Sequence, residues 1–344
     1  MRIAIHHKPG TFSDEWLRFC KLNEIDVKIV NCYDSDIVNQ LSDCDGLMWH
    51  WSQTDTRAVL FAKQLVYSLE SKGLSVFPDS NTSWHFDDKV GQKYLLEATG
   101  SPLVPAYVFY DKRQAKEWVK QSSFPKVFKL RGGASSVNVK IVRNKSMASW
   151  LIRKSFGRGF SPVHKINRLE DKFRKFRRSH DIKDLVMFLK GIIRLLSPSY
   201  DDRMLPREKG YVYFQDFIPD NTFDIRLVVI GKRAFRLKRL VRENDFRASG
   251  SGNFTFLKEG LPLEYLRIAF TLAGKLKLQS GAFDFITSNG KIMLLEVSYG
   301  FISDVYKTSS GFWDSDLNWH EERFVPEWFI MEDFIAGIKQ KRII

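Results

Sequence analysis

Two carboxylates stand in the middle of apolar segments late in the sequence. Asp284 lies within residues 283–286 (FDFI) and Glu296 within residues 292–297 (IMLLEV), and both segments are typical of strands. Burying two carboxylates together is unfavourable unless a cation lies between them. Mg²⁺ prefers oxygen ligands and commonly takes one or two carboxylates together with substrate phosphates. The pattern favours a Mg²⁺ site, with surface or salt-bridged carboxylates as the alternative.

The loop between these strands, residues 288–290 (SNG), decides whether the two carboxylates share a face. A two-residue Asn-Gly turn pairs position 284 with 295 and sends Asp284 and Glu296 to opposite faces. A three-residue loop with Gly290 in the left-handed conformation makes them diagonal neighbours on one face. The metal hypothesis therefore predicts the three-residue loop. Ser298 shares the face of Glu296 because strand side chains alternate.

A second group of candidates surrounds a glycine-rich turn at residues 131–136 (RGGASS). Lys129 ends the apolar strand that leads into this turn, and Lys89 begins a helix expected over 88–98. Backbone N–H groups of a glycine-rich turn can approach phosphate oxygens, and a lysine adds a positive charge. The Walker A pattern is absent. A plain hairpin and a solvated Lys89 are the alternatives.

Arginines follow later in the chain. Arg226 lies in a strand expected over 224–230, and Arg239, Arg242 and Arg247 stand beside a Gly/Ser-rich loop. Such arginines suit phosphate or carboxylate groups through paired N–H donors, and a charged surface loop is the alternative. Residues 214–219 (FQDFIP) leave a strand and could offer backbone hydrogen bonds to a planar ligand.

The elements that must position these residues fall into three regions. Strands and helices alternate over residues 1 to about 80, which indicates a small α/β domain with a parallel sheet. Residues 88–142 resemble a small α/β lid. From residue 211 strands dominate, with a helix expected over 262–278. The last 40 residues are rich in Trp and Phe and are expected to dock on the C-terminal core, with a dimer interface or a sugar-stacking surface as the alternative.

Composition narrows the class of protein. The chain has 344 residues, 44% of them hydrophobic, and a net charge of +14. These values exclude a disordered chain or a small disulfide scaffold and predict anionic partners. Three scattered cysteines without a CxxC pair, no signal-peptide pattern and no long apolar stretch favour a cytoplasmic protein.

The basic charge is concentrated in residues 151–210, which hold sixteen Lys or Arg against seven Asp or Glu. Within this window, apolar residues of 182–196 recur at helical spacing with Lys183, Lys190 and Arg194 among them. The window is expected to dock an anionic acceptor, with Arg174, Lys175, Arg177 and Arg178 as the residues to neutralise in a test. Peripheral contact with an anionic membrane and a solvated helical insertion are the alternatives.

Taken in order, these segments resemble the ATP-grasp superfamily, close to the ribosomal-protein glutamate ligase and D-alanine–D-alanine ligase branch. The resemblance extends from residue 86 to residue 300. It is carried by FDDK (86–89), VFKLRGGASSVNV (127–139), FQDFI (214–218), DIRLVVIG (224–231), RLVRENDFRASGSGNF (239–254), GAFDFI (281–286) and LLEVSYG (294–300).

The resemblance implies an α/β (α+β) ATP-grasp fold. A Rossmann-like domain would occupy residues 1–85, and a linker helix and lid 86–215, with the basic insertion at 151–210. An antiparallel-sheet domain would occupy 216–344. For the nucleotide, the resemblance implies phosphate binding by Lys89 and Lys129, a phosphate loop at Gly132, Gly133, Ser135 and Ser136, and an adenine hinge at Gln215, Asp216, Phe217 and Ile218. It implies catalysis by Arg226, Arg247 and Lys129. It implies Mg²⁺ binding by Asp284, Glu296 and Ser298.

Ser298 departs from the family, which usually has Asn at this position, and the departure puts a second metal ion in question. The implied activity is ATP- and Mg²⁺-dependent ligation of a carboxylate to an amine through an acyl phosphate. An acidic cell-surface polysaccharide precursor or a protein tail would be one substrate. No histidine is needed for this chemistry. A nucleotide-binding pseudoenzyme and a basic nucleic-acid-binding protein are the alternatives, but no DNA- or RNA-binding motif is present.

Overall fold

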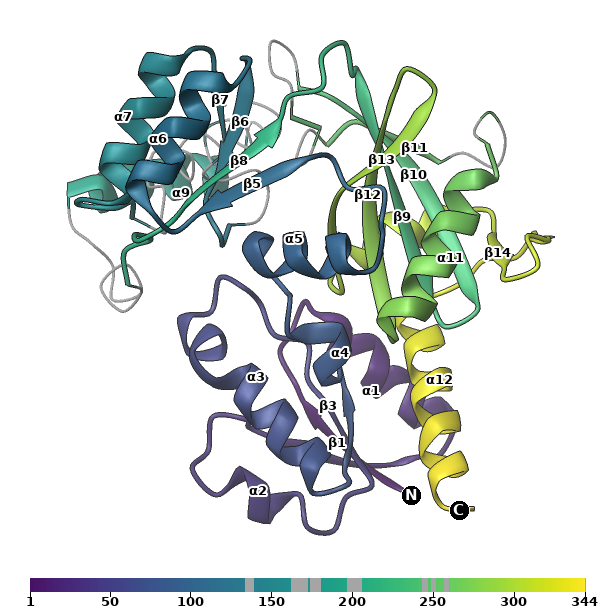
Figure 1. The fold of residues 1–344 in the computed structure, drawn as a ribbon. Coiled ribbons are helices and arrows are strands. Elements are labelled where there is room, and N and C mark those ends of the chain that lie inside the picture. Colours follow the sequence, from purple (N-terminus) through teal and green to yellow (C-terminus); the bar gives the residue numbers. More distant parts are fainter. Residues whose placement is uncertain are drawn as a thin grey trace. The chain divides into compact units, whose positions relative to one another are not determined.

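The computed structural model describes residues 1–133, 139–161, 173, 181–196, 206–242, 247–248, 252–256, 260 and 262–343. Cα packing divides the chain into two compact units. The first unit comprises Met1–Phe86, Gly91–Leu103 and Asp220–Ile344, and the second comprises Asp87–Val90 and Val104–Pro219 (Figure 1). The N- and C-terminal regions thus share one unit, and the three-domain division predicted from the sequence stays a prediction.

The first unit begins with a four-stranded parallel sheet in the order β2-β1-β3-β4. Alternation along β1 sends Ile3 and Ile5 to one core and Ala4 to the other, so both faces are covered, as in parallel sheets generally. The elements are β1 (Arg2–His6), α1 (Phe12–Leu22), β2 (Asp26–Val30), α2 (Ile37–Gln40), β3 (Gly46–Met48), α3 (Thr56–Ser71), β4 (Ser75–Phe77) and α4 (Ser80–Ser83).

Helix α12 (Pro326–Lys341), the last of the chain, returns to this first sheet. It packs beside α1 and contributes Phe334 and Ile338 to the core that also holds Ile3 and Ile5. A Cβ atom on Gly46 of β3 would lie 2.6 Å from the Phe334 ring, so glycine permits this close approach. The Trp/Phe-rich tail therefore serves the N-terminal sheet as well as the C-terminal one.

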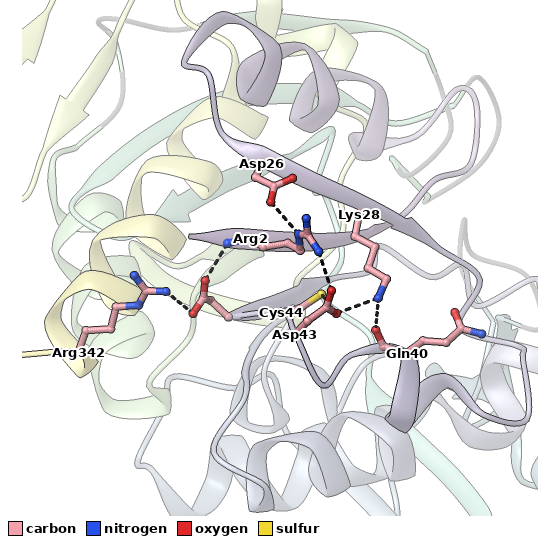
Figure 2. Close-up of polar contacts among 8 residues, drawn as sticks. Arg2, Asp26, Lys28, Gln40, Asp43, Cys44 and Arg342 are labelled. Carbon is pink, nitrogen blue, oxygen red and sulfur yellow. Dashed lines mark hydrogen bonds and ion pairs between the residues drawn. The ribbon is translucent and has the colours of Figure 1, made fainter.

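A polar network fixes the end of α12 and the start of β1 (Figure 2). The Arg342 guanidinium lies 2.5 Å from Asp45, whose other carboxylate oxygen accepts from the Arg2 backbone N–H at 2.7 Å. Asp43 accepts from Arg2 at 2.6 Å and from Lys28 at 2.8 Å. Burial raises the pKa of the neighbouring Cys44 thiol to about 11, so this cysteine is protonated at neutral pH.

A large antiparallel sheet forms the rest of the first unit, in the order β13-β12-β9-β10-β14-β15, with β11 paired to β10. Helix α11 covers one face through Leu266 and Ala269, and Phe235 and Val228 on the other face join the core of α12. The elements are α5 (Lys89–Ala98), β9 (Phe223–Ile230), β10 (Arg233–Leu240), β11 (Phe254–Phe256), α11 (Glu264–Leu276), β12 (Ser280–Ser288), β13 (Lys291–Ser298), η1 (Ser303–Thr308), β14 (Phe312–Asp314) and β15 (Trp319–His320).

The second unit contains a four-stranded antiparallel sheet in the order β5-β8-β6-β7. Phe128 and Phe214 point to the face covered by α6 and α7, where Ala115 and Leu151 complete the core. The elements are β5 (Ala106–Phe109), α6 (Lys112–Gln121), β6 (Lys126–Lys129), β7 (Lys140–Val142), α7 (Lys145–Ser155), α9 (Ile182–Leu196) and β8 (Val212–Asp216). No helix in the described part of the chain is long and apolar enough to span a membrane.

Candidate functional site

The hairpin that carries the two carboxylates closes with a two-residue turn. Ser288 pairs with Lys291, and Asn289 and Gly290 have φ angles of 50° and 73°. Two consecutive positive φ angles are those of a type I′ turn, whose twist matches that of antiparallel strands. The three-residue loop predicted from the sequence is therefore wrong.

A β-bulge nevertheless places both carboxylates on one face. The register shifts between Asp284 and Phe285, so that Asp284 lies opposite Glu296 while Phe285 lies opposite Leu294. Leu295 is the extra residue. Directly opposed residues of antiparallel strands point to the same side of a sheet. The bulge, rather than the loop, therefore places Asp284 and Glu296 on one face.

The same face continues across β9 and β10 as a buried ion-pair cluster. Asp284 lies opposite Arg226, and Asp224 lies opposite Arg239. Arg226 donates to both oxygens of Asp284 at 2.6 and 2.7 Å, and Arg239 donates to both oxygens of Asp224 at the same distances. The Arg239 guanidinium also lies 2.8 Å from Asp284. Paired guanidinium–carboxylate contacts of this kind are short and orient both groups.

The charges around the two aspartates give them different pKa values. Burial would raise the pKa of Asp284, but the charges of Arg226 and Arg239 outweigh it and lower the pKa to about 2. Burial, reinforced by the nearby Asp284 charge, raises the pKa of Asp224 to about 6 against the opposing effect of Arg239. Asp284 therefore stays ionised to a lower pH than Asp224 does.

Among the described residues, Glu296 is the carboxylate of this face without a counter-ion. It is half-buried, and within the described ranges no hydrogen bond or ion pair reaches its oxygens. In this cluster on β9, β10, β12 and β13, the three carboxylates of Asp224, Asp284 and Glu296 face the two guanidinium groups of Arg226 and Arg239, which leaves one negative charge. Carboxylate oxygens with surplus negative charge suit Mg²⁺, so Glu296 fits the predicted ion directly, and Asp284 would share its oxygens with Arg226 and Arg239.

Ser298 fits the predicted metal role less well. Its hydroxyl donates to the Gly300 carbonyl at 3.0 Å and accepts from the Gly300 N–H at 3.2 Å. One lone pair is then left for another partner. Among the described residues, no three or more His, Cys, Asp or Glu side chains gather as a metal site, so the candidate donors are two carboxylates and, at most, this hydroxyl.

Tyr306 of η1 borders the cluster and was missed by the sequence analysis. It is 1% exposed, and its hydroxyl has no hydrogen-bond partner in the part of the chain that the structure describes. Burial raises the pKa of this hydroxyl, and Arg226 and Arg239 act on it electrostatically. Nothing in its local sequence marks it. The pairing of Asp224 with Arg239, by contrast, follows from strand alternation once the β9–β10 register is known.

Arg247 lies in the segment after β10. Its backbone carbonyl accepts from the Arg242 N–H at 3.1 Å, and the Leu240 N–H donates to Asn253 at 3.0 Å. These bonds hold the described ends of the loop near β10. The catalytic role of the Arg247 side chain stays a prediction.

In the second unit, the glycine-rich turn is held by Asp87, which precedes α5, and by Lys89, the first residue of α5. The Gly133 N–H donates to both oxygens of Asp87 at 2.9 and 3.0 Å. The Lys89 ammonium donates to the Gly133 carbonyl at 2.8 Å, and the Lys89 backbone N–H donates to the Arg131 carbonyl at 2.9 Å. Lys89 is 8% exposed, so the alternative of a solvated lysine is wrong. Asp87 and Lys89 together fix the described part of the turn, which includes Gly132.

Lys129 and Gln215 lie on the face of the second unit's sheet opposite to α6 and α7. The register pairs Val127 with Gln215 and Lys129 with Tyr213, whereas their neighbours Phe128 and Phe214 enter the helix-covered core. Lys129 is buried, and the Gln215 amide donates to the Val104 carbonyl at 3.3 Å. The sheet therefore places these two candidates together.

Asp216 points the other way. Its carboxylate accepts from the Lys126 ammonium at 2.6 Å, on the side of Phe128 and Phe214. Its backbone N–H donates to the Pro105 carbonyl at 2.9 Å. Phe217 and Ile218 follow directly and are half-buried. Ser135 and Ser136 lie outside the described residues, as do Arg174, Lys175, Arg177 and Arg178.

No protein-family model and no curated protein sequence matches this chain. Solved structures do match it over almost its full length. The structure of a RimK-domain ATP-grasp protein from Sphaerobacter thermophilus is 14% identical with a TM-score of 0.57, covering 98% of this chain and 100% of its own. D-alanine–D-alanine ligase from Bacillus anthracis is 14% identical with a TM-score of 0.53, covering 99% of each chain. D-cycloserine synthetase DcsG is 12% identical with a TM-score of 0.59, covering 98% and 100%.

Proposed function

Because the chain has the ATP-grasp fold, we propose that it is an ATP-dependent ligase that joins a carboxylate to an amine. The fold resemblance found in the sequence is confirmed, and the activity is inferred from it together with the two sites. The observation that carries the proposal is the charged sheet face of the first unit. There Asp284 and Glu296 lie opposite each other beside Arg226.

The proposed reaction has two steps. A substrate carboxylate oxygen attacks the γ-phosphorus of ATP, the bond to the β-phosphate oxygen breaks, and ADP leaves. The amine then attacks the carbonyl carbon of the acyl phosphate, loses a proton, and expels inorganic phosphate. Mg²⁺ held by Asp284 and Glu296, with Ser298 as a weaker third donor, would neutralise charge on the phosphates.

This chain's own cations would supply the rest of the charge stabilisation. Arg226 is half of a buried ion pair with Asp284, so its guanidinium is fixed before any ligand arrives. Preorganised charges of this kind are worth more than mobile ones because they need no reorganisation during reaction. Arg247 is proposed to assist at the acyl phosphate.

Nucleotide binding is proposed for the second unit. Lys129 would contact the phosphates, and the Gly132–Gly133 backbone would approach them with Ser135 and Ser136. Lys89 would act in part by holding the Gly133 carbonyl. Gln215, Phe217, Ile218 and the backbone of Asp216 would surround adenine. The Asp216 carboxylate is assigned to Lys126 instead, because the two lie 2.6 Å apart.

The acceptor is proposed to be anionic, an acidic cell-surface polysaccharide precursor or an acidic protein tail. The sixteen Lys or Arg against seven Asp or Glu in residues 151–210 support this choice. A cytoplasmic location and a homodimer belong to the same proposal. Nucleic acid is not proposed as a partner.

The experiment is a thermal shift of the full chain with Mg²⁺-ADP and Mg²⁺-ATP, repeated on an Asp284→Asn/Glu296→Gln variant. A ligand at 100 times its Kd adds about 2.7 kcal/mol of stability. The parent should be stabilised only with Mg²⁺ present, and the variant should not. No shift in the parent would overturn the proposal.

A nucleotide-binding pseudoenzyme is the second candidate, because the Ser298 hydroxyl is engaged with Gly300. ADP release would be followed with a panel of acidic carboxylates and amines. Nucleotide binding without ADP release under any pair would favour the pseudoenzyme over the ligase.

A further inference from the structure

Helix α9 of the second unit exposes its large apolar side chains. Ile182 is 76% exposed, Met187 50%, Leu189 49%, and Val186 and Ile192 are each 41% exposed. By contrast Asp184 is only 9% exposed, and Leu185 and Phe188 are half-buried. A surface helix normally turns its apolar side chains inward, so the orientation of α9 is the reverse of the usual one.

Four of these five exposed apolar side chains form a continuous stripe, and Met187 lies beyond its lysine edge. At roughly 100° per residue, Ile182, Val186 and Leu189 lie above one another, and Ile192 borders them. Lys183 and Lys190, seven residues apart, run along one edge of the stripe, and both are exposed. The opposite side carries Phe188, whose ring centroid lies 5.1 Å from that of Phe173. The helix is therefore anchored by one side and presents apolar and basic groups on the other.

Charge complementarity identifies the surface that such a helix fits. The segment directly before it, residues 162–180, has seven Lys or Arg against two Asp or Glu. An apolar stripe edged by lysines matches a phospholipid surface, where acyl chains receive the apolar side chains and phosphates receive the cations. Fifteen helical residues span only about 22 Å, which is short for crossing a bilayer. We propose that α9 lies flat on an anionic membrane surface.

This docking needs no nucleotide and no ligase activity. A failure of vesicle binding would leave the proposed reaction untouched, and a failure of the reaction would leave the docking untouched. If both hold, the ligase works on an acceptor presented at a membrane.

The test is co-sedimentation of the full chain with vesicles of phosphatidylcholine alone and of phosphatidylcholine mixed with phosphatidylserine. The parent should sediment with the anionic vesicles and be released by high salt, because surface charges are screened. Each lysine near an anionic surface is worth about fivefold in binding. Lys183→Glu/Lys190→Glu should therefore weaken binding by about 25-fold or more, and Val186→Gln/Leu189→Gln should weaken it by a similar factor.

Matched controls lie on other exposed helix faces. Lys112→Glu/Lys116→Glu on α6 makes the same charge change in the same unit, and Val59→Gln/Leu60→Gln on α3 removes exposed apolar side chains elsewhere. Both controls should bind as the parent does. Since all these positions are exposed, circular dichroism should show every variant folded.

Four outcomes would overturn the proposal. In the first, the parent sediments with neither vesicle type. In the second, it binds neutral and anionic vesicles equally. In the third, the α9 variants bind as the parent does. The fourth is a parent that is a dimer and does not bind vesicles, together with a Val186→Gln/Leu189→Gln variant that is a monomer. That result would assign the stripe to a second copy of this chain instead.

Discussion

The two candidate sites hold their charges in different ways. In the first unit, Asp284 and Arg226 neutralise each other side chain to side chain across adjacent strands. In the second unit, Asp87 and Lys89 bind the backbone of Gly133 instead. The first arrangement fixes charged groups rigidly where phosphate chemistry is proposed. The second shapes a turn and leaves its conformation dependent on two side chains from a distant segment.

The largest loss in the free energy of unfolding should come from breaking the ion-pair cluster. Asp284→Ala leaves Arg226 without its partner and Arg239 with one partner fewer, and breaking a buried pair costs about 3–5 kcal/mol. Urea denaturation measures the loss, with Asp316→Ala on an exposed loop as the control. A loss below about 1 kcal/mol would show that the cluster does not depend on this carboxylate.

Removing a charge from the second unit should act on ligand binding more than on folding. Lys129→Ala should abolish the stabilisation by Mg²⁺-ATP, about 2.7 kcal/mol at 100 times the Kd. Lys140→Ala on the neighbouring strand β7 is the matched control and should keep it. Equal thermal shifts in the two variants would remove Lys129 from the nucleotide site.

Acid should weaken the first site by a predictable amount. Asp284 has a pKa of about 2 in the fold and about 3.9 when unfolded, so its stabilising effect is complete above pH 4. It is lost as the pH falls from about 4 to about 2, which amounts to roughly 2 to 3 kcal/mol. Unfolding free energies of the parent and of Asp284→Asn should therefore converge as the pH falls through this range. A constant difference between them would contradict the assignment.

The smallest effect should follow from releasing the glycine-rich turn. Asp87→Ala removes the acceptor of the Gly133 N–H, a change worth about 1–2 kcal/mol, and should speed hydrogen exchange at Gly133. Asp87→Asn keeps one acceptor oxygen and tolerates the positive φ of 52° at this position. It should exchange more slowly than the alanine variant. Exchange unchanged in both would mean that Lys89 alone holds the turn.

Strand alternation made much of the first site predictable from the sequence. The strand segments and the shared face of Glu296 and Ser298 follow from it, whereas the shared face of Asp284 and Glu296 requires the bulge. The bulge at Asp284 does not follow from alternation, because an extra residue in one strand leaves no mark in an apolar segment such as IMLLEV. Only the order of segments pointed to the fold, since no single motif is specific.

Loop geometry and long-range partners were beyond sequence reasoning. The ion pair between Asp216 and Lys126 depends on the register of β6 and β8, which lie far apart in the chain. The burial of the Tyr306 hydroxyl beside Arg226 and Arg239 depends on how η1 packs against β10. In each case tertiary contacts decide the orientation of a side chain whose local sequence permits several.

The return of α12 to the first sheet has a consequence for how the chain comes to fold. Ile3 and Ile5 share a core with Phe334 and Ile338, which the ribosome adds long after β1 to β4 have emerged. Until then that core contains side chains of α1 but lacks those of α12, so it stays partly open to solvent. The order of synthesis thus delays completion of the N-terminal core until α12 has been made.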